Sequence, residues 1–249
     1  MQESIFREND IRGQYPNELN ESIIKEIAKG IAKKCFQEGV TKIAVGRDGR
    51  LSGESLLSNF CEAISVYGID VNNIGLATSP MLYFAAKKEE SKSGIMITGS
   101  HNPKNYNGIK MVINNNSVSG SEILSLIKND EIYLNTSAKG EISFTNIKEN
   151  YINEVIENIQ HDISKLKVVV DSGNGAAGYV APELFKKLGC DVIELFSEVD
   201  GNFPNHHPDP GKIENLKDII LAVKENSADI GFAFDGDGDR VGLITNKGE

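Results

Sequence analysis

Two stretches of this chain repeat one order of predicted elements, and that repeat limits the fold more than any other feature. Residues 41–113 and 167–245 each read strand, helix, strand, helix, strand, loop, strand. Strands that alternate with helices form parallel βαβ units with right-handed crossovers. The last connection in each stretch is short, which predicts an antiparallel edge strand in each sheet. The sequence therefore predicts an α/β fold of two related domains, each a mainly parallel mixed sheet flanked by helices.

Local signals set the expected element boundaries. Asn20 can cap the N-terminus of a helix, and Gly39, Gly68 and Gly189 stand where helical patterns stop. Residues 146–165 have helical apolar spacing and are expected to bridge the two domains, which we place at residues 1–145 and 146–249. The predicted strands are 42–45, 69–74, 94–97, 109–113, 168–170, 191–196, 229–234 and 241–245, and the predicted helices are 20–38, 53–67, about 79–90, 146–165, 179–188 and about 213–226.

The loop before the last strand of the second stretch alternates aspartate with glycine. Asp235, Asp237 and Asp239 repel one another unless a cation lies between them, and carboxylate oxygens suit Mg²⁺ or Ca²⁺. An EF-hand is excluded, because its sixth and twelfth positions are Arg240 and Asn246 and the flanking segments are strands. The alternative interpretation is a solvated acidic turn, but three carboxylates after a buried strand favour a metal site.

The equivalent loop of the first stretch leads from Ser100 and His101 towards Lys110. It follows the carboxyl end of a strand, where ligands gather in open α/β sheets. Ser100 is either a nucleophile or an ordinary turn residue. No GxSxG motif surrounds it, and a neighbouring histidine makes general-base geometry awkward. The chemistry of these residues alone leaves both interpretations open.

The composition disfavours several classes of function. A net charge of −10 and a pI near 5.0 are unlike those of bulk nucleic-acid or anionic-membrane binders. The polar N-terminus lacks a signal-peptide core, and no apolar run approaches the ~18–20 residues that span a bilayer. The three cysteines form no CxxC pair, which predicts buried thiols and a cytoplasmic location.

Four motifs in order, spread over the whole chain, resemble the α-D-phosphohexomutases, and within them the phosphomannomutase/phosphoglucomutase branch. One departure is Asn9, where many relatives carry an aromatic residue. The motifs are the phosphoserine loop Thr98-Gly-Ser-His-Asn-Pro103 with Tyr106-Asn-Gly-Ile-Lys110, the metal loop Asp235-Gly-Asp-Gly-Asp-Arg240, the N-terminal signature Phe6-Arg-Glu-Asn-Asp-Ile-Arg-Gly13 and the second-domain loop Gly201-Asn-Phe-Pro-Asn-His-His-Pro-Asp-Pro210.

The resemblance implies that Ser100 is a phosphoserine that donates and later retrieves a phosphoryl group. Its oxygen would join Asp235, Asp237 and Asp239 around Mg²⁺. Phosphorylation adds about −1.5 to −2 charges at neutral pH, which a cation must offset beside three carboxylates.

The resemblance also implies roles for four basic side chains. Lys110 would be the general acid/base at a sugar hydroxyl, helped by Arg12 and His101. Such a lysine needs a lowered pKa, and Arg12 and Arg240 are the expected causes. Arg240 would hold the transferring phosphate, so Arg12, Lys110 and Arg240 form the expected substrate-binding set.

The implied enzyme is an isomerase of carbohydrate metabolism. It would move a phosphoryl group reversibly between the 1- and 6-positions of a hexose phosphate, of mannose, glucose or both, through a hexose 1,6-bisphosphate. Thr98-Gly99 resembles that branch, whereas phosphoglucosamine mutases, the nearest competing candidate, more often show Ser-Ala there. A metal-dependent phosphatase and a non-catalytic phosphosugar- or metal-binding module are the remaining two candidates. No nucleic-acid or membrane partner is expected.

The family has four domains, and the segments of this chain match the first two. The loops that read the sugar hydroxyls and grip the non-reacting phosphate belong to the third and fourth domains. We therefore expect these 249 residues to bind metal and to show negligible mutase turnover alone.

Three further clusters have a functional and a structural interpretation. His206-His207 suggests a transition-metal site, but the surrounding prolines favour a shaped loop. The turn 171–178 resembles a phosphate cradle, but tight strand–helix packing fits it better because it lacks the Lys-Ser/Thr of a P-loop. Arg47 and Arg50 either raise the local positive potential or are ordinary turn charges.

Overall fold

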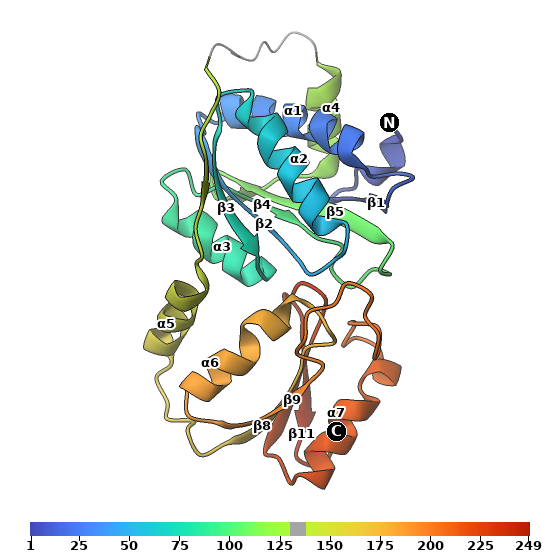
Figure 1. Ribbon diagram of the computed structural model, residues 1–249, viewed down its shortest axis with the longest axis vertical. Coiled ribbons are helices and arrows are strands. Elements are labelled where there is room, and N and C mark those ends of the chain that lie inside the picture. The colour runs from blue at the N-terminus through green and yellow to red at the C-terminus, as the bar shows by residue number, and fades with distance from the viewer. Residues whose placement is uncertain (130–137) are drawn as a thin grey trace.

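The computed structural model describes residues 1–129 and 138–249 and contains two sheets (Figure 1). In Figure 1 the first sheet and its helices fill the upper half and the second sheet fills the lower half. We call these the first and second units. A helix that follows the first sheet in the chain, α5 (Lys148–Asn158), lies at the junction between them.

The first sheet has the order β1-β5-β4-β2-β3-β7, and β6 pairs with β5 outside this path. Its central strands are parallel, because each returns through a helix, whereas β5 is antiparallel to β4. The strands are β1 (Ile11–Gln14), β2 (Lys42–Arg47), β3 (Asp70–Leu76), β4 (Gly94–Ile97), β5 (Tyr106–Ile113), β6 (Asn116–Ser117) and β7 (Ile142–Phe144).

Helices cover both faces of the first sheet. Ile27, Phe60 and Ile123, from three different helices, share one apolar cluster on one face. Met81 and Leu82 of a fourth helix pack against the other face. The helices are α1 (Glu21–Gln37), α2 (Gly53–Ser65) and α4 (Gly120–Lys128) on the first face and α3 (Ser79–Lys88) on the second, with the short η1 (Glu3–Ile5) near the N-terminus.

The second sheet has the order β11-β10-β8-β9 and repeats this layering. Ile219 and Val223 pack on one face, and Ala181 packs on the other. The strands are β8 (Lys167–Asp171), β9 (Asp191–Leu195), β10 (Ile230–Phe234) and β11 (Val241–Thr245), and the helices are α6 (Ala181–Lys187), α7 (Lys217–Glu225) and the short η2 (Ala176–Tyr179) and η3 (Ile213–Asn215).

The predicted α/β fold is confirmed, but the edge of the first sheet differs from the prediction. β11 is the antiparallel edge strand of the second sheet, as expected. In the first sheet β5 is antiparallel but not at the edge, because β1 pairs with it from Ile11↔Ile109 to Gln14↔Tyr106. β1 has only four residues and includes Arg12 and Gly13, so it shows no apolar alternation that could have predicted it.

Capping residues explain where several helices begin and end. The Asn20 side chain accepts hydrogen bonds from the first-turn N–H groups of α1, and the Thr78 hydroxyl does so for α3. Gly39 and Gly68 follow α1 and α2 with φ of +67° and +78°, which glycine adopts readily. The bridging helix is shorter than expected, since α5 ends at Asn158 rather than Lys165.

The two units share an apolar cluster. Ala44 and Met81 of the first unit, Ile152 of α5 and Val180 of the second unit belong to one group of buried side chains. Their common burial fixes how the two sheets lie relative to each other. Because of this packing, loops that leave the two sheets at the junction are held in a fixed relation.

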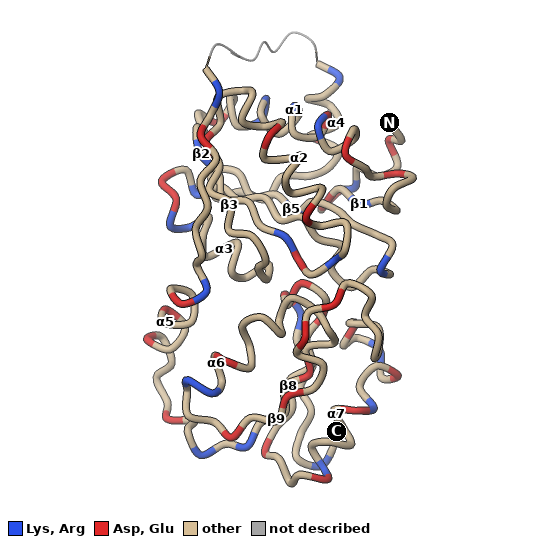
Figure 2. Tube along the Cα trace, in the orientation of Figure 1, with Lys and Arg blue, Asp and Glu red and all other residues tan. Residues whose placement is uncertain are grey.

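Charged side chains lie on both units, and the three thiols are buried. Figure 2 shows Lys and Arg spread over both units and interleaved with Asp and Glu. Cys35, Cys61 and Cys190 are buried free thiols, as predicted. Among the described residues, no helix is both long enough and apolar enough to cross a membrane.

Candidate active site

The two loops singled out in the sequence meet at the junction of the units. The serine loop (residues 98–106) follows β4, and the aspartate loop (residues 235–240) follows β10. Ser100 Oγ donates a hydrogen bond of 2.9 Å to Asp235 Oδ2 across the junction. A Cβ on Gly236 would lie 2.5 Å from the Ser100 carbonyl oxygen, so only glycine allows this approach. The loops are therefore in direct contact, 135 residues apart in the chain.

Ser100 is buried in an unusual backbone conformation. Its φ is +49°, a left-handed value that is uncommon for residues other than glycine. The Thr98 hydroxyl accepts a hydrogen bond of 2.8 Å from the Ser100 N–H. His101 Nδ1 lies 3.3 Å from Ser100 Oγ, a long contact that fits the awkward geometry expected for neighbouring residues. The loop thus turns the hydroxyl of Ser100 towards the aspartates.

The three aspartates form a compact cluster of carboxylates. One oxygen from each of Asp235, Asp237 and Asp239 lies within 4.8 Å of the others. Asp235 and Asp237 are fully buried, and Asp237 Oδ1 has no hydrogen-bond partner within the described structure. A buried carboxylate oxygen without a partner is costly, and a hard cation would satisfy it. The cluster fits a hard divalent cation on this ground.

The aspartates repel one another, and this appears in their pKa values. Burial, together with the charges of Asp237 and Asp239, raises the pKa of Asp235 to about 8. Burial also acts to raise the pKa of Asp237, but the ammonium of Lys110, together with hydrogen bonds to Ser79 and Asp235, outweighs burial and holds that pKa below its ordinary value. The cluster therefore favours a cationic neighbour.

Lys110 corrects one sequence-based expectation. Its Nζ lies 2.6 Å from Asp237 Oδ2 and also binds Asp239. Burial acts to lower the pKa of Lys110, but these two carboxylates outweigh burial and raise that pKa. The expected lowering by Arg12 and Arg240 is thus wrong for this arrangement, because the nearest charges are negative. Lys110 is a cation here at neutral pH.

The remaining predicted residues line an open pocket of about 460 Å³ above Ser100. Arg12, His101 and Arg240 are all part of its wall. Burial and the two arginines lower the pKa of His101 below 6.5, so its imidazole is neutral at pH 7. The pocket therefore combines permanent cations with one neutral base.

Arg7 and Tyr83 are among the wall residues of this pocket that received no role from the sequence. Arg7 belongs to the N-terminal signature but was given no role, and Tyr83 of α3 carried no signal of its own. Asn9, the departure from the family pattern, also lies in the wall.

The contacts of His206-His207 and of the turn 171–178 fit a structural role rather than a metal or phosphate site. His206 Nε2 lies 3.0 Å from both oxygens of Asp171, and His207 Nε2 lies 2.7 Å from the carbonyl oxygen of His101. In the turn 171–178, the Ala176 N–H donates to the Gly236 carbonyl at 3.0 Å. Both segments therefore support the two loops from the second unit.

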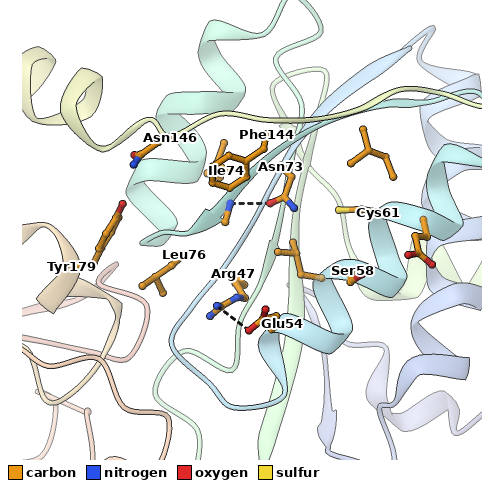
Figure 3. A pocket seen from close by; sticks show the side chains of 14 residues that line it. Arg47, Glu54, Ser58, Cys61, Asn73, Ile74, Leu76, Phe144, Asn146 and Tyr179 are labelled. Atoms are coloured by element: carbon orange, nitrogen blue, oxygen red, sulfur yellow. Dashed lines mark hydrogen bonds and ion pairs between the residues drawn. The ribbon is translucent and has the colours of Figure 1, made fainter.

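A larger pocket of about 550 Å³ lies beside β3 and α2, away from the two loops (Figure 3). Some of its polar groups have partners: Arg47 pairs with Glu54 at 3.7 Å, and Asn73 accepts a hydrogen bond from the Gly75 N–H at 2.8 Å. It contains no cluster of carboxylates among the described residues. The chemistry of the chain is therefore concentrated in the smaller pocket.

Comparison with known families matches nearly the whole chain. Residues 3–132 match the family profile described as phosphoglucomutase/phosphomannomutase, alpha/beta/alpha domain I, and residues 149–248 match the profile described as domain II of the same family.

Curated relatives carry the names of phosphosugar mutases. A phosphomannomutase/phosphoglucomutase of Pseudomonas syringae pv. tomato is 48% identical over 246 residues, which are 99% of this chain and 53% of the relative. A phosphoglucomutase of Neisseria gonorrhoeae is 43% identical over 247 residues, 98% of this chain and 53% of the relative. A probable phosphoglucosamine mutase of Methanosphaera stadtmanae is 32% identical over 251 residues, 98% of this chain and 55% of the relative.

A solved structure agrees with the fold. The phosphoglucomutase/phosphomannomutase family protein of Burkholderia thailandensis superposes with a TM-score of 0.94 at 39% identity, over 100% of this chain and 56% of that one. The chain spans about half the length of the curated relatives it matches.

Proposed function

Because the chain belongs to the phosphoglucomutase/phosphomannomutase family, we propose that it forms the phosphoryl-transfer centre of a hexose-phosphate mutase. One observation supports this most directly: Ser100 Oγ lies 2.9 Å from Asp235, within a buried cluster of three carboxylates. Ser100 also lines the pocket to which Arg12, Lys110 and Arg240 contribute. Mannose phosphate and glucose phosphate, in their 1- and 6-phosphorylated forms, are the proposed substrates.

In the proposed reaction, phosphorylated Ser100 donates its phosphoryl group to the free hydroxyl of a hexose monophosphate. The P–Oγ bond breaks, a P–O bond to the sugar forms, and the hydroxyl proton passes to a base of the protein. The product is a hexose 1,6-bisphosphate. Transfer of the second phosphoryl group of this sugar back to Ser100 restores the phosphoserine and releases the isomerised monophosphate.

Charge neutralisation and positioning supply most of the catalysis in phosphoryl transfer. Asp235, Asp237, Asp239 and Ser100 would hold Mg²⁺, which when bound offsets the charge of the phosphate beside three carboxylates. Arg12 and Arg240 would orient the phosphate from the pocket wall, where both lie.

The structure refines the proposed proton transfer. His101 is neutral at pH 7 because burial and the two arginines lower its pKa, so it suits the role of proton acceptor. Lys110 is cationic because Asp237 and Asp239 raise its pKa, and a raised pKa makes an ammonium a weak proton donor at pH 7. We therefore assign the base to His101, and we assign Lys110, as a cation, to binding of the phosphorylated substrate.

The proposal retains a division into residues 1–145, which carry the serine loop, and residues 146–249, which carry the aspartate loop. Two separate family matches support it, since they leave residues 133–148 between them. Each part would contribute one half of the transfer centre.

Labelling with a phosphoryl donor tests the proposal. The protein is incubated with Mg²⁺ and hexose 1,6-bisphosphate labelled in its phosphates, and the label is located by peptide mass analysis. We expect one phosphoryl group on Ser100 and none in Ser100→Ala. Ser58→Ala, which changes a serine in the distant pocket of Figure 3, is the matched control and should label normally.

The competing functions give different results in the same experiment. Steady release of inorganic phosphate without hexose 6-phosphate indicates a phosphatase. Binding with neither label nor release indicates a non-catalytic module. Label that persists in Ser100→Ala refutes Ser100 as the acceptor. A coupled assay of the complete gene product with glucose, mannose and glucosamine 1-phosphates then separates the mutase branches.

A further inference from the structure

The side chain of Arg50 is completely buried, although it carries a permanent charge. It lies in the turn between β2 and α2, which the sequence left as either a source of potential or an ordinary turn charge. Burying a guanidinium without partners is costly in free energy. Its partners therefore show what holds it there.

Four of its N–H groups bind carbonyl oxygens of the serine loop. Nη1 donates to Pro103 at 2.6 Å and to Tyr106 at 2.8 Å. Nη2 donates to Ser100 and to Asn102, both at 2.7 Å. A guanidinium presents its donors in a rigid planar fork, which lysine cannot reproduce. Arg50 therefore fixes four peptide groups of the loop in one arrangement.

Two neighbours hold the guanidinium in place. Asp48 Oδ2 accepts from Arg50 Nε at 3.2 Å, and also from the Thr98 hydroxyl at 2.8 Å and the Gly99 N–H at 3.1 Å. A Cβ on Gly99 would lie 2.4 Å from Arg50 Cζ, so glycine leaves the room that the guanidinium occupies. The ring of Phe203, from the second unit, lies 5.4 Å from Arg50 Cζ.

We propose that Arg50 is a positioning residue for phosphoryl transfer, which it serves by holding Ser100 in its left-handed conformation with Oγ directed at the aspartate loop. The inference rests on the proposed function. A backbone with φ of +49° at serine is strained and persists only where its surroundings fix it. The hydrogen bond from Arg50 to the Ser100 carbonyl fixes the peptide that follows this residue.

Position matters more than local charge in this role. A displacement of ~1 Å in a reacting group can slow a reaction on the order of 100-fold. Arg50→Lys keeps the charge but cannot bind four carbonyls, so it separates the two effects. Arg47→Lys is the matched control, because Arg47 lies close by at the end of β2 but faces the pocket of Figure 3, where it pairs with Glu54.

The test uses the complete gene product and measures single-turnover transfer from labelled Ser100 over a range of hexose monophosphate concentrations, together with amide hydrogen exchange of the serine loop. In Arg50→Lys we expect transfer on the order of 100-fold slower, without a change in KM, and faster exchange in the loop. Arg47→Lys should match wild type in both measurements. Wild-type transfer and exchange in Arg50→Lys would overturn the inference.

Failure of the proposed function gives a different pattern. A wild-type protein that takes no label refutes that function, while the exchange measurement still decides whether Arg50 fixes the loop. If Arg50→Lys does not fold, Gly99→Ala replaces it, because its methyl group displaces the guanidinium without removing a donor. Slower transfer and faster loop exchange are expected there too, and wild-type behaviour overturns the inference.

Discussion

The serine loop and the aspartate loop occupy matching places in the two units, but the chain stabilises them in opposite ways. The serine loop closes over Arg50, a buried cation of its own unit. The aspartate loop gathers three carboxylates within 4.8 Å, and the cation that binds two of them, Lys110, comes from the first unit. Contacts with Arg50 therefore fix the conformation of the serine loop. The carboxylates of the aspartate loop, in contrast, take a cationic partner from the other unit.

The largest effect on stability is expected when the carboxylate that anchors Arg50 beneath the serine loop is removed. Asp48→Ala leaves the Arg50 guanidinium buried without its carboxylate, which we expect to cost about 3–5 kcal/mol in free energy of unfolding. Urea denaturation measures this loss. The control is Asp191→Ala, since the side chain of Asp191 is 71% exposed. Equal stability of the two variants would contradict the anchoring role.

The next effect concerns the cation affinity of the aspartate loop. Asp237→Ala removes a carboxylate whose Oδ1 has no partner of its own among the described residues. We expect Mg²⁺ affinity to fall by at least the roughly 10- to 100-fold that loss of an outer-shell partner costs. Isothermal titration calorimetry measures it, and an unchanged affinity refutes the assignment of Asp237 as a ligand.

A third substitution, in the aspartate loop, should change stability in the direction opposite to Asp48→Ala. Burial, together with Asp237 and Asp239, raises the pKa of Asp235 to about 8, so folding at neutral pH requires this carboxyl to take up a proton, which lowers the free energy of unfolding. Asp235→Asn should therefore increase the free energy of unfolding in a buffer with EDTA, unlike Asp48→Ala. Thermal unfolding in EDTA checks the sign, and a decrease would show that mutual repulsion does not dominate the loop.

The smallest expected effect is a change of stability with pH, and it concerns the contact between His206 and Asp171. Burial acts to lower the pKa of His206, but the carboxylate of Asp171 outweighs burial and raises that pKa above 6.5. A raised histidine pKa contributes stability fully below pH 6.5 and loses it as the pH rises through the folded-state value. Wild type should therefore lose stability over this range relative to His206→Gln. Parallel denaturation curves for both proteins would count against the ion pair.

The sequence was enough to place the two loops, but it did not predict the contacts between residues that lie far apart in the chain. Ser100 and the aspartates could be singled out because they follow recognisable strands, whereas the role expected of Ser100 came from the family resemblance. The units that carry them follow from periodicity. The role of Arg50 was not predictable, since its acceptors are carbonyl groups 50 or more residues away, and a carbonyl has no sequence signature. The predicted lowering of the Lys110 pKa was wrong because the carboxylate that raises it, Asp237, lies 127 residues away in the chain.

The edge of the first sheet was missed for a related reason. β1 and β6 are short and lack apolar alternation, and they form strands only because β5 offers them backbone partners. Their existence depends on pairing rather than on propensity.

The apolar cluster that includes Met81 and Val180 has a consequence for modularity. Cutting the chain between the two sheets would expose one side of this cluster in each half, so neither half should behave as a transplantable module. We expect both sheets to melt in a single cooperative transition, and chimaeras that exchange one unit would have to exchange its half of the cluster as well.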